Sequence, residues 1–343
     1  LRLDDRDAAM EALTPRNADV SEVMKRVTTH DLAERMPPAD AKTTLTPAQI
    51  ETLRTWIAEG ARYESHWAFI KPERPAVPAV KQPVWARNPI DNFVLARLEA
   101  NNVAPSAVAD RRILIRRAYL DLIGMPPAPE AVDAFLTDPS SDAYEKMIDG
   151  LLASPHFGER WGRHWLDVAR YADSDGYGID NPRPIWKYRE WVIDALNADM
   201  PFDRFATKQL AGDLLPDGTR DDVVATGFHR NTMINMEGGV DPEEFRIVSI
   251  VDRVNTTGSV FLGLTIGCAQ CHTHKYDPIT QTEYYQFFAF FNNDDEINID
   301  LPSPEQEEEL KLARANVAEA QRTLNAYING VEDYLLAQWE QSL

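Results

Sequence analysis

The 343-residue chain has only two cysteines and lacks a long apolar run. Its most apolar stretch, 258–267, is much shorter than the roughly 20 residues of a membrane-spanning helix. Positive charge is also scarce, because 35 Lys and Arg face 55 Asp and Glu, giving a formal net charge of −20 at pH 7. Nucleic acids and anionic membranes repel such a chain. We therefore expect no nucleic-acid partner and no membrane insertion.

Several catalytic signatures are missing as well. We find no Gly-x-Ser-x-Gly, no His-Glu-x-x-His, no phosphate-binding loop and no Gly-x-Gly-x-x-Gly. Serine hydrolases, zinc proteases and nucleotide enzymes thus lose their usual sequence support. The chain opens at Leu1 without an initiator Met or a signal-peptide pattern, and it stops inside a strongly helical segment. We expect it to be a piece of a longer protein.

The composition is that of an ordinary globular protein, with 44% hydrophobic and 26% charged residues. This is enough apolar material for two or three cores. Polar and apolar residues show little strict alternation, whereas helix starts recur in which a side-chain acceptor precedes a proline. These starts are Thr46-Pro47, Asn88-Pro89, Ser154-Pro155, Asp241-Pro242 and Ser303-Pro304. The sequence therefore predicts a mostly α fold with many helices.

The proline-rich stretch Lys71–Val84 is typical of an extended linker. Together with the flanking sequence, this linker suggests that the chain has four parts. We expect an N-terminal part at 1–66, a linker at 67–87, a helical domain at 88–295 and a C-terminal arm at 296–343.

The C-terminal arm has apolar side chains spaced alternately by three and four residues from Leu310 to Tyr334. This spacing is typical of a coiled-coil seam. Asn329-Gly330 lies within the seam, where a helix could bend or break. We favour one arm of a helical hairpin leading to a missing domain, and a dimerisation coil is the alternative.

Both cysteines lie in Cys268-Ala-Gln-Cys271-His272, and this spacing is the attachment signature of c-type haem. The thiols would form thioethers with the haem vinyl groups, and His272 would be the proximal iron ligand. His274 follows two residues later, a span of about 7 Å, so we do not expect it to reach the opposite face of the haem. Because haem c is assembled outside the cytoplasm, this interpretation predicts a periplasmic or cell-surface protein.

Two alternatives remain for this segment. Cys268, Cys271, His272 and His274 could bind zinc, although four ligands within seven residues leave little freedom for a tetrahedron. The cysteines could instead form a disulfide in an oxidising compartment.

Downstream, six aromatic residues fall within 284–291, after the capping box Thr280-x-x-Glu283. We expect this helix to be buried all round, as the wall of a haem pocket or as ordinary core.

Several further motifs resemble those of the planctomycete-type cytochrome proteins, large exported multidomain proteins of Planctomycetes and Verrucomicrobia. They are Asn88-Pro-Ile-Asp-Asn-Phe, Arg116-Arg-Ala-Tyr-Leu-Asp-Leu-Ile-Gly-Met-Pro-Pro, Ser154-Pro-His-Phe-Gly-Glu-Arg-Trp, His164-Trp-Leu-Asp-Val-Ala-Arg-Tyr-Ala-Asp, Gln209-Leu-Ala-Gly-Asp-Leu-Leu-Pro, Gly227-Phe-His-Arg-Asn-Thr and the run from Gly267 to Pro278. The resemblance covers about 66–295.

Residues 1–65 resemble the C-terminal part of the cytochrome c-like domain that precedes this one in the family. There, Met36-Pro-Pro resembles the segment that supplies the distal Met of a first haem. The chain begins after the matching attachment site, so Met36 would serve only where that site exists upstream. The remaining domains of the same protein are expected partners.

Polar residues recur at helical spacing between Ser154 and Asp173. If that segment is one helix, His164, Asp167 and Arg170 share a face. Together with His229 and Glu237 they are candidates for a catalytic cleft, and a structural ion network is the alternative.

Two further ligand sites are conceivable. Met233, Met236 or His229 could supply the distal haem ligand. Asp173, Asp175 and Asp180 lie in a Gly-containing acidic loop that could wrap calcium, although it lacks the bidentate Glu of an EF-hand and could equally be a solvated turn.

These observations favour an exported c-type haem protein acting in electron transfer or as a haem-dependent oxidoreductase. A redox protein or a carbohydrate-type substrate would be its partner. One alternative is a non-redox carbohydrate-active enzyme with paired carboxylates and a structural haem. Another is a scaffold module of a surface assembly.

Overall fold

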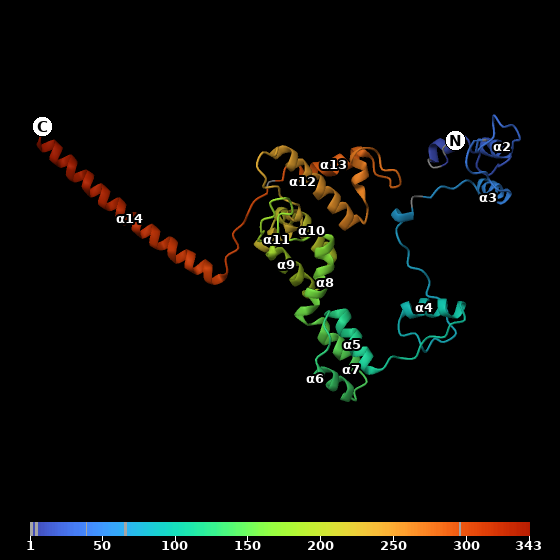
Figure 1. Cartoon of the computed structure of the whole chain (residues 1–343), viewed down its shortest axis with the longest axis horizontal. Coiled ribbons are helices and arrows are strands. Elements are labelled where there is room, and N and C mark those ends of the chain that lie inside the picture. The colour runs from blue at the N-terminus through green and yellow to red at the C-terminus, as the bar shows by residue number, and fades with distance from the viewer. Residues whose placement is uncertain (1–2, 4–5, 39, 65–66, 295) are drawn as a thin grey trace. The chain divides into compact units, whose positions relative to one another are not determined.

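The computed structural model describes residues 3, 6–38, 40–64, 67–294 and 296–343 (Figure 1). The predicted mostly α fold is confirmed, because every named element within these ranges is helical. Extended pairing among the described residues is limited to two isolated bridges, Ser174–Pro182 and Gly176–Ile234. The chain divides into two compact units, Leu1–Ala107 and Val108–Leu343.

The first unit contains four α-helices and a 3-10 turn among its described residues. They are α1 (Arg6–Met10), α2 (Glu22–Thr28), α3 (Pro47–Ala58), η1 (Trp67–Phe69) and α4 (Pro89–Ala100). The predicted start of α3 is confirmed, since the Thr46 hydroxyl accepts from Gln49 N and Thr46 N donates to the Gln49 side chain. A core of small and aliphatic residues, including Val23, Met24 and Ile57, joins α2 to α3.

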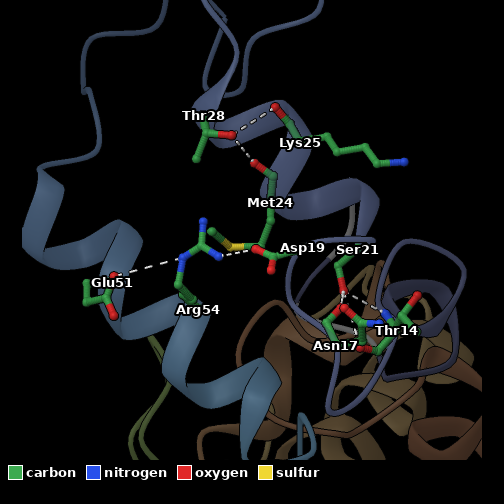
Figure 2. Close-up of polar contacts among 9 residues, drawn as sticks. All are labelled: Thr14, Asn17, Asp19, Ser21, Met24, Lys25, Thr28, Glu51 and Arg54. Carbon is green, nitrogen blue, oxygen red and sulfur yellow. Dashed lines mark hydrogen bonds and ion pairs between the residues drawn. The ribbon is translucent and has the colours of Figure 1, made fainter.

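A buried serine organises the turn before α2 (Figure 2). The Ser21 hydroxyl accepts from Thr14 N at 2.9 Å and donates to Asn17 O, also at 2.9 Å. Nearby, Arg54 of α3 forms an ion pair with Asp19 and lies 3.9 Å from Glu51. These contacts tie the turn and α3 into one small unit.

The second unit carries the remaining helices. They are α5 (Arg111–Leu122), α6 (Pro129–Thr137), α7 (Ala143–Leu152), α8 (Pro155–Val168), α9 (Trp186–Asn197), α10 (Phe202–Ala211), η2 (Gly212–Leu214), α11 (Arg220–Ala225), η3 (Thr226–Asn231), α12 (Pro242–Thr257), η4 (Gly258–Leu262), η5 (Ile266–Gln270), α13 (Gln281–Phe291) and α14 (Pro304–Gln341). The starts predicted at Pro89, Pro155, Pro242 and Pro304 are all confirmed, each with a side chain capping the first turn.

Three apolar clusters hold the second unit. Ile115 and Phe135 lie in the first, between α5, α6 and α7. Tyr188 and Phe228 lie in the second, which α8, α9, α10 and η3 build. The third joins α12, η5 and α13 through a set of buried residues, Ile250, Val254, Ile266, Ala269, Tyr284 and Phe291.

Helices α8 and α9 approach closely because α8 carries a glycine at the contact. A Cβ at Gly158 would lie 2.4 Å from the Ile193 carbonyl oxygen and 2.7 Å from the Asn197 side chain. Asn197 Oδ1 in turn accepts from Gly158 N at 2.7 Å. This close approach lets Trp165, which is on α8, reach the second cluster.

The C-terminal helix α14 runs for 38 residues. Gly330 does not interrupt it, so the break considered at that position does not occur. Within the part of the chain that the structure describes, no helix combines the length and the apolar character needed to span a membrane.

Candidate functional site

The Cys-x-x-Cys-His segment lies on η5 and the turn that follows. Ile266 and Ala269 point into the third cluster and are buried, whereas Cys268 and Cys271 are exposed with free thiols. The two buried positions are three residues apart, and so are the two cysteines, because a 3-10 helix makes one turn about every three residues. The segment therefore anchors itself with two apolar side chains and leaves both sulfurs open to an incoming group.

Glycine and aromatic residues fix this anchor. A Cβ at Gly258, at the start of η4, would come within 2.6 Å of Ile266 Cδ1, so the close seating of Ile266 requires glycine there. The Gln270 carbonyl accepts from the Tyr285 hydroxyl at 3.1 Å and from Gln281 Nε2 at 3.0 Å. Both donors belong to α13, which thus holds the end of η5 by its backbone.

The imidazole of His272 is exposed and oriented by its own backbone. Its Nδ1 lies 2.8 Å from the Thr273 carbonyl oxygen. A carbonyl can only accept, so Nδ1 carries a proton, and in the neutral imidazole Nε2 is then the nitrogen with the free lone pair. Metal-bound histidines usually have this arrangement, in which the far nitrogen donates to a carbonyl and the near one binds the metal.

His274 has a different role. Its Nδ1 accepts from Asp277 N at 2.8 Å and from Tyr276 N at 3.3 Å, and its side chain is 7% exposed. The imidazole therefore closes the loop after the motif. Among the described residues, no group of three or more His, Cys, Asp or Glu side chains is placed to hold a metal ion. The zinc alternative has no support from this geometry.

Two exposed thiols and an imidazole with a free Nε2 are the donor set that a covalent haem requires. They stand on one short segment, so the residues present fit this group. Once attached there, Cys268 and Cys271 would hold the macrocycle and His272 would bind its iron.

The expectation that α13 is buried all round is wrong. Tyr284 and Phe291 are buried against α12, but Tyr285 and Phe290 are exposed, Phe290 to 77%. Within its cluster α13 packs on α12 and η5, and these cover only part of its surface. A shallow groove runs along the open part, lined by Gln281, Thr282, Tyr285, Gln286 and Ala289. Because Gln281 and Tyr285 bond to Gln270, this groove borders the motif.

The polar face proposed on α8 is not continuous. The helix ends at Val168 and Arg170 has a left-handed φ of 60°, so Arg170 leaves the helical face of His164 and Asp167. Arg170 forms an ion pair with Asp252 of α12 instead. His164 is exposed beside Trp161, with the ring centroids 5.6 Å apart.

The other two candidate catalytic residues lie elsewhere. Glu237 Oε1 lies 2.2 Å from the position that a Cβ on Gly178 would take, so the carboxylate rests on the acidic loop. His229 of η3 packs against Phe228 and Phe291, with ring centroids 5.2 and 5.0 Å away. Among the described residues, no hydrogen bond, ion pair or ring contact joins either of them to His164 or Asp167.

His229 is the most perturbed titratable group among these candidates. Both ring nitrogens are buried, and the Leu210 backbone is the polar group that favours the charged form of the ring. Burial, helped by the nearby Arg253 guanidinium, lowers the pKa of His229 from 6.5 to about 4. The imidazole is therefore neutral at pH 7.

The acidic loop uses its carboxylates internally. Asp173 accepts from the Tyr171 hydroxyl and pairs with Arg189 at 3.4 Å. Asp180 accepts from Gly176 N at 2.7 Å, and this hydrogen bond lowers its pKa. Asp175 is buried. Separate partners hold Asp173 and Asp180, and no group of three or more His, Cys, Asp or Glu side chains among the described residues is placed to hold a metal ion, so the geometry gives calcium no support.

The methionines proposed as distal ligands are accessible. Met233 and Met236 are both exposed, and Met233 Cγ lies 2.9 Å from the position of a Cβ on Gly176. Met36 is half-buried in the first unit, where its N donates to Arg26 O at 2.9 Å.

Comparison with protein families identifies the family to which the chain belongs. A family model for PSCyt2, described as a protein of unknown function (DUF1549), matches residues 89–296, more than half of the chain. The chain belongs to the PSCyt2 family. A second family model, planctomycete cytochrome C, matches residues 1–40. The predicted membership of a planctomycete-type cytochrome family is thus confirmed, and the second match hints at a haem protein. Comparison with curated proteins and with solved structures gave no match.

In this PSCyt2 chain, the sequence did not reveal an ion-pair network of two arginines and one glutamate. Arg253 of α12 is buried, donates to His229 O at 3.2 Å and forms an ion pair with Glu296. Arg230 also pairs with Glu296, at 3.1 Å. These residues are 23 to 66 positions apart, so no local spacing could have revealed the contact.

Proposed function

We propose that the chain is a c-type haem protein that carries one haem on Cys268 and Cys271 and passes electrons to a redox partner. A single observation carries the proposal: both thiols are exposed on the segment that ends in His272, and the Thr273 carbonyl fixes Nδ1 as the protonated nitrogen. The planctomycete cytochrome C match to residues 1–40 gives independent support.

When bound, haem would supply one-electron chemistry at its iron. The chain's own residues would position the haem. The thiols would hold the macrocycle, and the hydrogen bond from His272 Nδ1 to Thr273 O orients the imidazole. Ile266 and Ala269 anchor the segment in the apolar cluster, which limits its movement relative to α13.

Electron transfer is favoured over substrate chemistry because the candidate catalytic side chains have separate partners. Arg170 pairs with Asp252, Glu237 rests on the acidic loop and His229 is buried among aromatic rings. A cleft that performs acid and base catalysis needs such groups within reach of one substrate. A carbohydrate-active enzyme would require that convergence, so it remains the lesser proposal.

The partner and the compartment follow from charge and from haem chemistry. A net charge of −20 would attract a redox protein with a positive surface and speed its encounter at low ionic strength. Covalent haem attachment takes place outside the cytoplasm, so we place the protein in the periplasm or at the cell surface. In a longer protein with an upstream attachment site, Met36 would be the distal ligand of a first haem.

Expression in a host that matures c-type haem tests the proposal. The denatured chain should retain a reduced pyridine-haemochrome band and carry the mass of one haem, and the native protein should titrate as a reversible one-electron couple. The variant with both Cys268→Ser and Cys271→Ser should lose the band while keeping its helical circular dichroism. A wild-type mass equal to that of the bare polypeptide would overturn the proposal.

A further inference from the structure

Helix α14 leaves a long apolar seam uncovered. None of its residues is buried, and every large seam residue is exposed. From Leu310 to Tyr334 the seam extends over about 36 Å, at 1.5 Å per residue. A continuous apolar stripe of this length marks a contact surface for another helix.

The seam residues have an uneven distribution of sizes. In heptad terms the a positions are Leu310, Val317, Leu324 and Val331, and the d positions are Ala313, Ala320, Tyr327 and Tyr334. The small d residues are thus in the N-terminal half and the bulky ones in the C-terminal half. A parallel pair would stack Ala on Ala at one end and Tyr on Tyr at the other.

A reversed second copy of the same helix matches these sizes. Antiparallel pairing places Leu310 opposite Tyr334, Ala313 opposite Val331, Val317 opposite Tyr327, and Ala320 opposite Leu324, and the same four layers then repeat by symmetry. Each alanine meets a larger aliphatic residue and each tyrosine an aliphatic one. Facing large and small side chains fill the space between helices evenly.

The surface of α14 shows the hollow that this pairing needs. A shallow groove surrounds Ala320, lined by Asn316, Glu319, Ala320, Thr323, Leu324 and Tyr327. In the antiparallel register, Leu324 of the second copy enters this groove. The symmetry of the pair repeats the contact, so two leucines fill two grooves.

Charge also selects the antiparallel orientation. The first turns of α14 carry four glutamates, Glu305, Glu307, Glu308 and Glu309. A parallel pair would bring eight carboxylates together, and like charges at an interface are costly. The antiparallel register sets this acidic block beside 335–339 of the second copy, which contains no charged residue.

We propose that α14 is a homodimerisation helix that pairs antiparallel with α14 of a second copy, centred between Gln321 and Thr323. The proposal concerns assembly and does not depend on haem attachment. It takes the dimerisation coil in place of the hairpin arm, because the seam matches its own reverse in size and this register keeps the two acidic N-terminal blocks apart.

Spin labels on the outer face of α14 test the orientation in the full chain. Ala315, Arg322 and Asn329 occupy equivalent outward heptad positions, and an azide-bearing unnatural side chain at each accepts a label without touching Cys268 or Cys271. In the antiparallel pair, label-to-label distances are shortest at 322 and clearly longer at both 315 and 329, where the axial offset is about 21 Å. Equal distances at all three positions indicate a parallel pair, and no intermolecular distance indicates another occupant. Both results would overturn the proposal.

A matched pair of leucine variants tests the seam itself. Leu324→Glu places a charge in both grooves and should lower the dimer association constant by at least 100-fold, as measured by light scattering across concentrations. Leu312→Glu makes the same change at an outward position and should leave the dimer intact. Circular dichroism checks that both variants stay helical. A monomeric wild type, or a Leu324→Glu variant that remains dimeric, would contradict the proposed interface.

Discussion

The imidazole of His272 donates from Nδ1 to the carbonyl oxygen of its neighbour Thr273 at 2.8 Å. The hydrogen-bonding role of His272 therefore differs from that of His274, whose Nδ1 accepts from Asp277 N at the same distance. One histidine thus leaves its Nε2 without a protein partner among the described residues, whereas the other holds its own loop.

Replacing the two histidines should therefore have opposite effects. His272→Ala should convert the haem iron to high spin or cause haem loss during maturation, with little change in unfolding free energy. His274→Ala should keep the haem spectrum but destabilise the loop by about 1–3 kcal/mol, because it leaves the Asp277 N–H without an acceptor. Absorption spectra and denaturant unfolding measure the two effects.

His274→Asn provides the control, since an Asn Oδ1 occupies nearly the position of the histidine Nδ1 and can accept from Asp277 N. It should recover most of the lost stability. Loss of the low-spin haem spectrum in His274→Asn, with His272 intact, would show that the role assigned to His274 is incorrect.

The stability of the second unit should depend on pH through His229. Its pKa is about 4 in the folded chain and 6.5 when unfolded, so between these values the unfolded chain binds the extra proton. Unfolding free energy should be highest above pH 6.5 and fall as the pH drops towards 4, by at most about 3 kcal/mol. Urea unfolding at several pH values measures the slope.

His229→Leu removes the titrating group and should flatten this part of the profile. The comparison isolates His229 from the carboxylates, because both proteins share every Asp and Glu. An unchanged slope in the variant would mean that another group causes the pH dependence.

Two glycines in neighbouring helices should respond oppositely to alanine. Gly158→Ala brings a Cβ within 2.4 Å of the Ile193 carbonyl oxygen, a backbone atom that cannot swing aside, and should destabilise the second unit by about 1–3 kcal/mol. Gly150→Ala, in α7, meets nothing within 4 Å and should stabilise by about 0.5–1 kcal/mol. Thermal unfolding of the two variants decides the matter, and a shift of the same sign in both would contradict the packing described for α8 and α9.

The first unit should be sensitive to Ser21. Ser21→Ala removes the acceptor for Thr14 N inside a buried turn and should cost about 1–3 kcal/mol. Thr28→Val, at the end of α2, removes a hydroxyl whose acceptor, Met24 O, lies within the helix, and should change stability by less than about 0.5 kcal/mol. Equal losses in the two variants, measured by chemical unfolding, would argue against a special role for Ser21.

Local sequence determined the helices and the motif. The caps at Thr46, Ser154 and Ser303 act within four residues, so the residue order alone was enough to predict where α3, α8 and α14 begin. The spacing of Cys268, Cys271 and His272 is equally local. The haem itself and the roles of the candidate site residues stay predictions.

Tertiary structure alone decided which side chains meet. The pairing of Arg170 with Asp252, the burial of His229 against Phe291 and the joining of Arg230 to Arg253 through Glu296 depend on helices packed across long sequence separations. Helical periodicity shows which residues share a face, but a face is buried only where another helix covers it. For the same reason Phe290 is exposed in a helix rich in aromatic residues, because α12 and η5 cover the part of α13 that carries Tyr284.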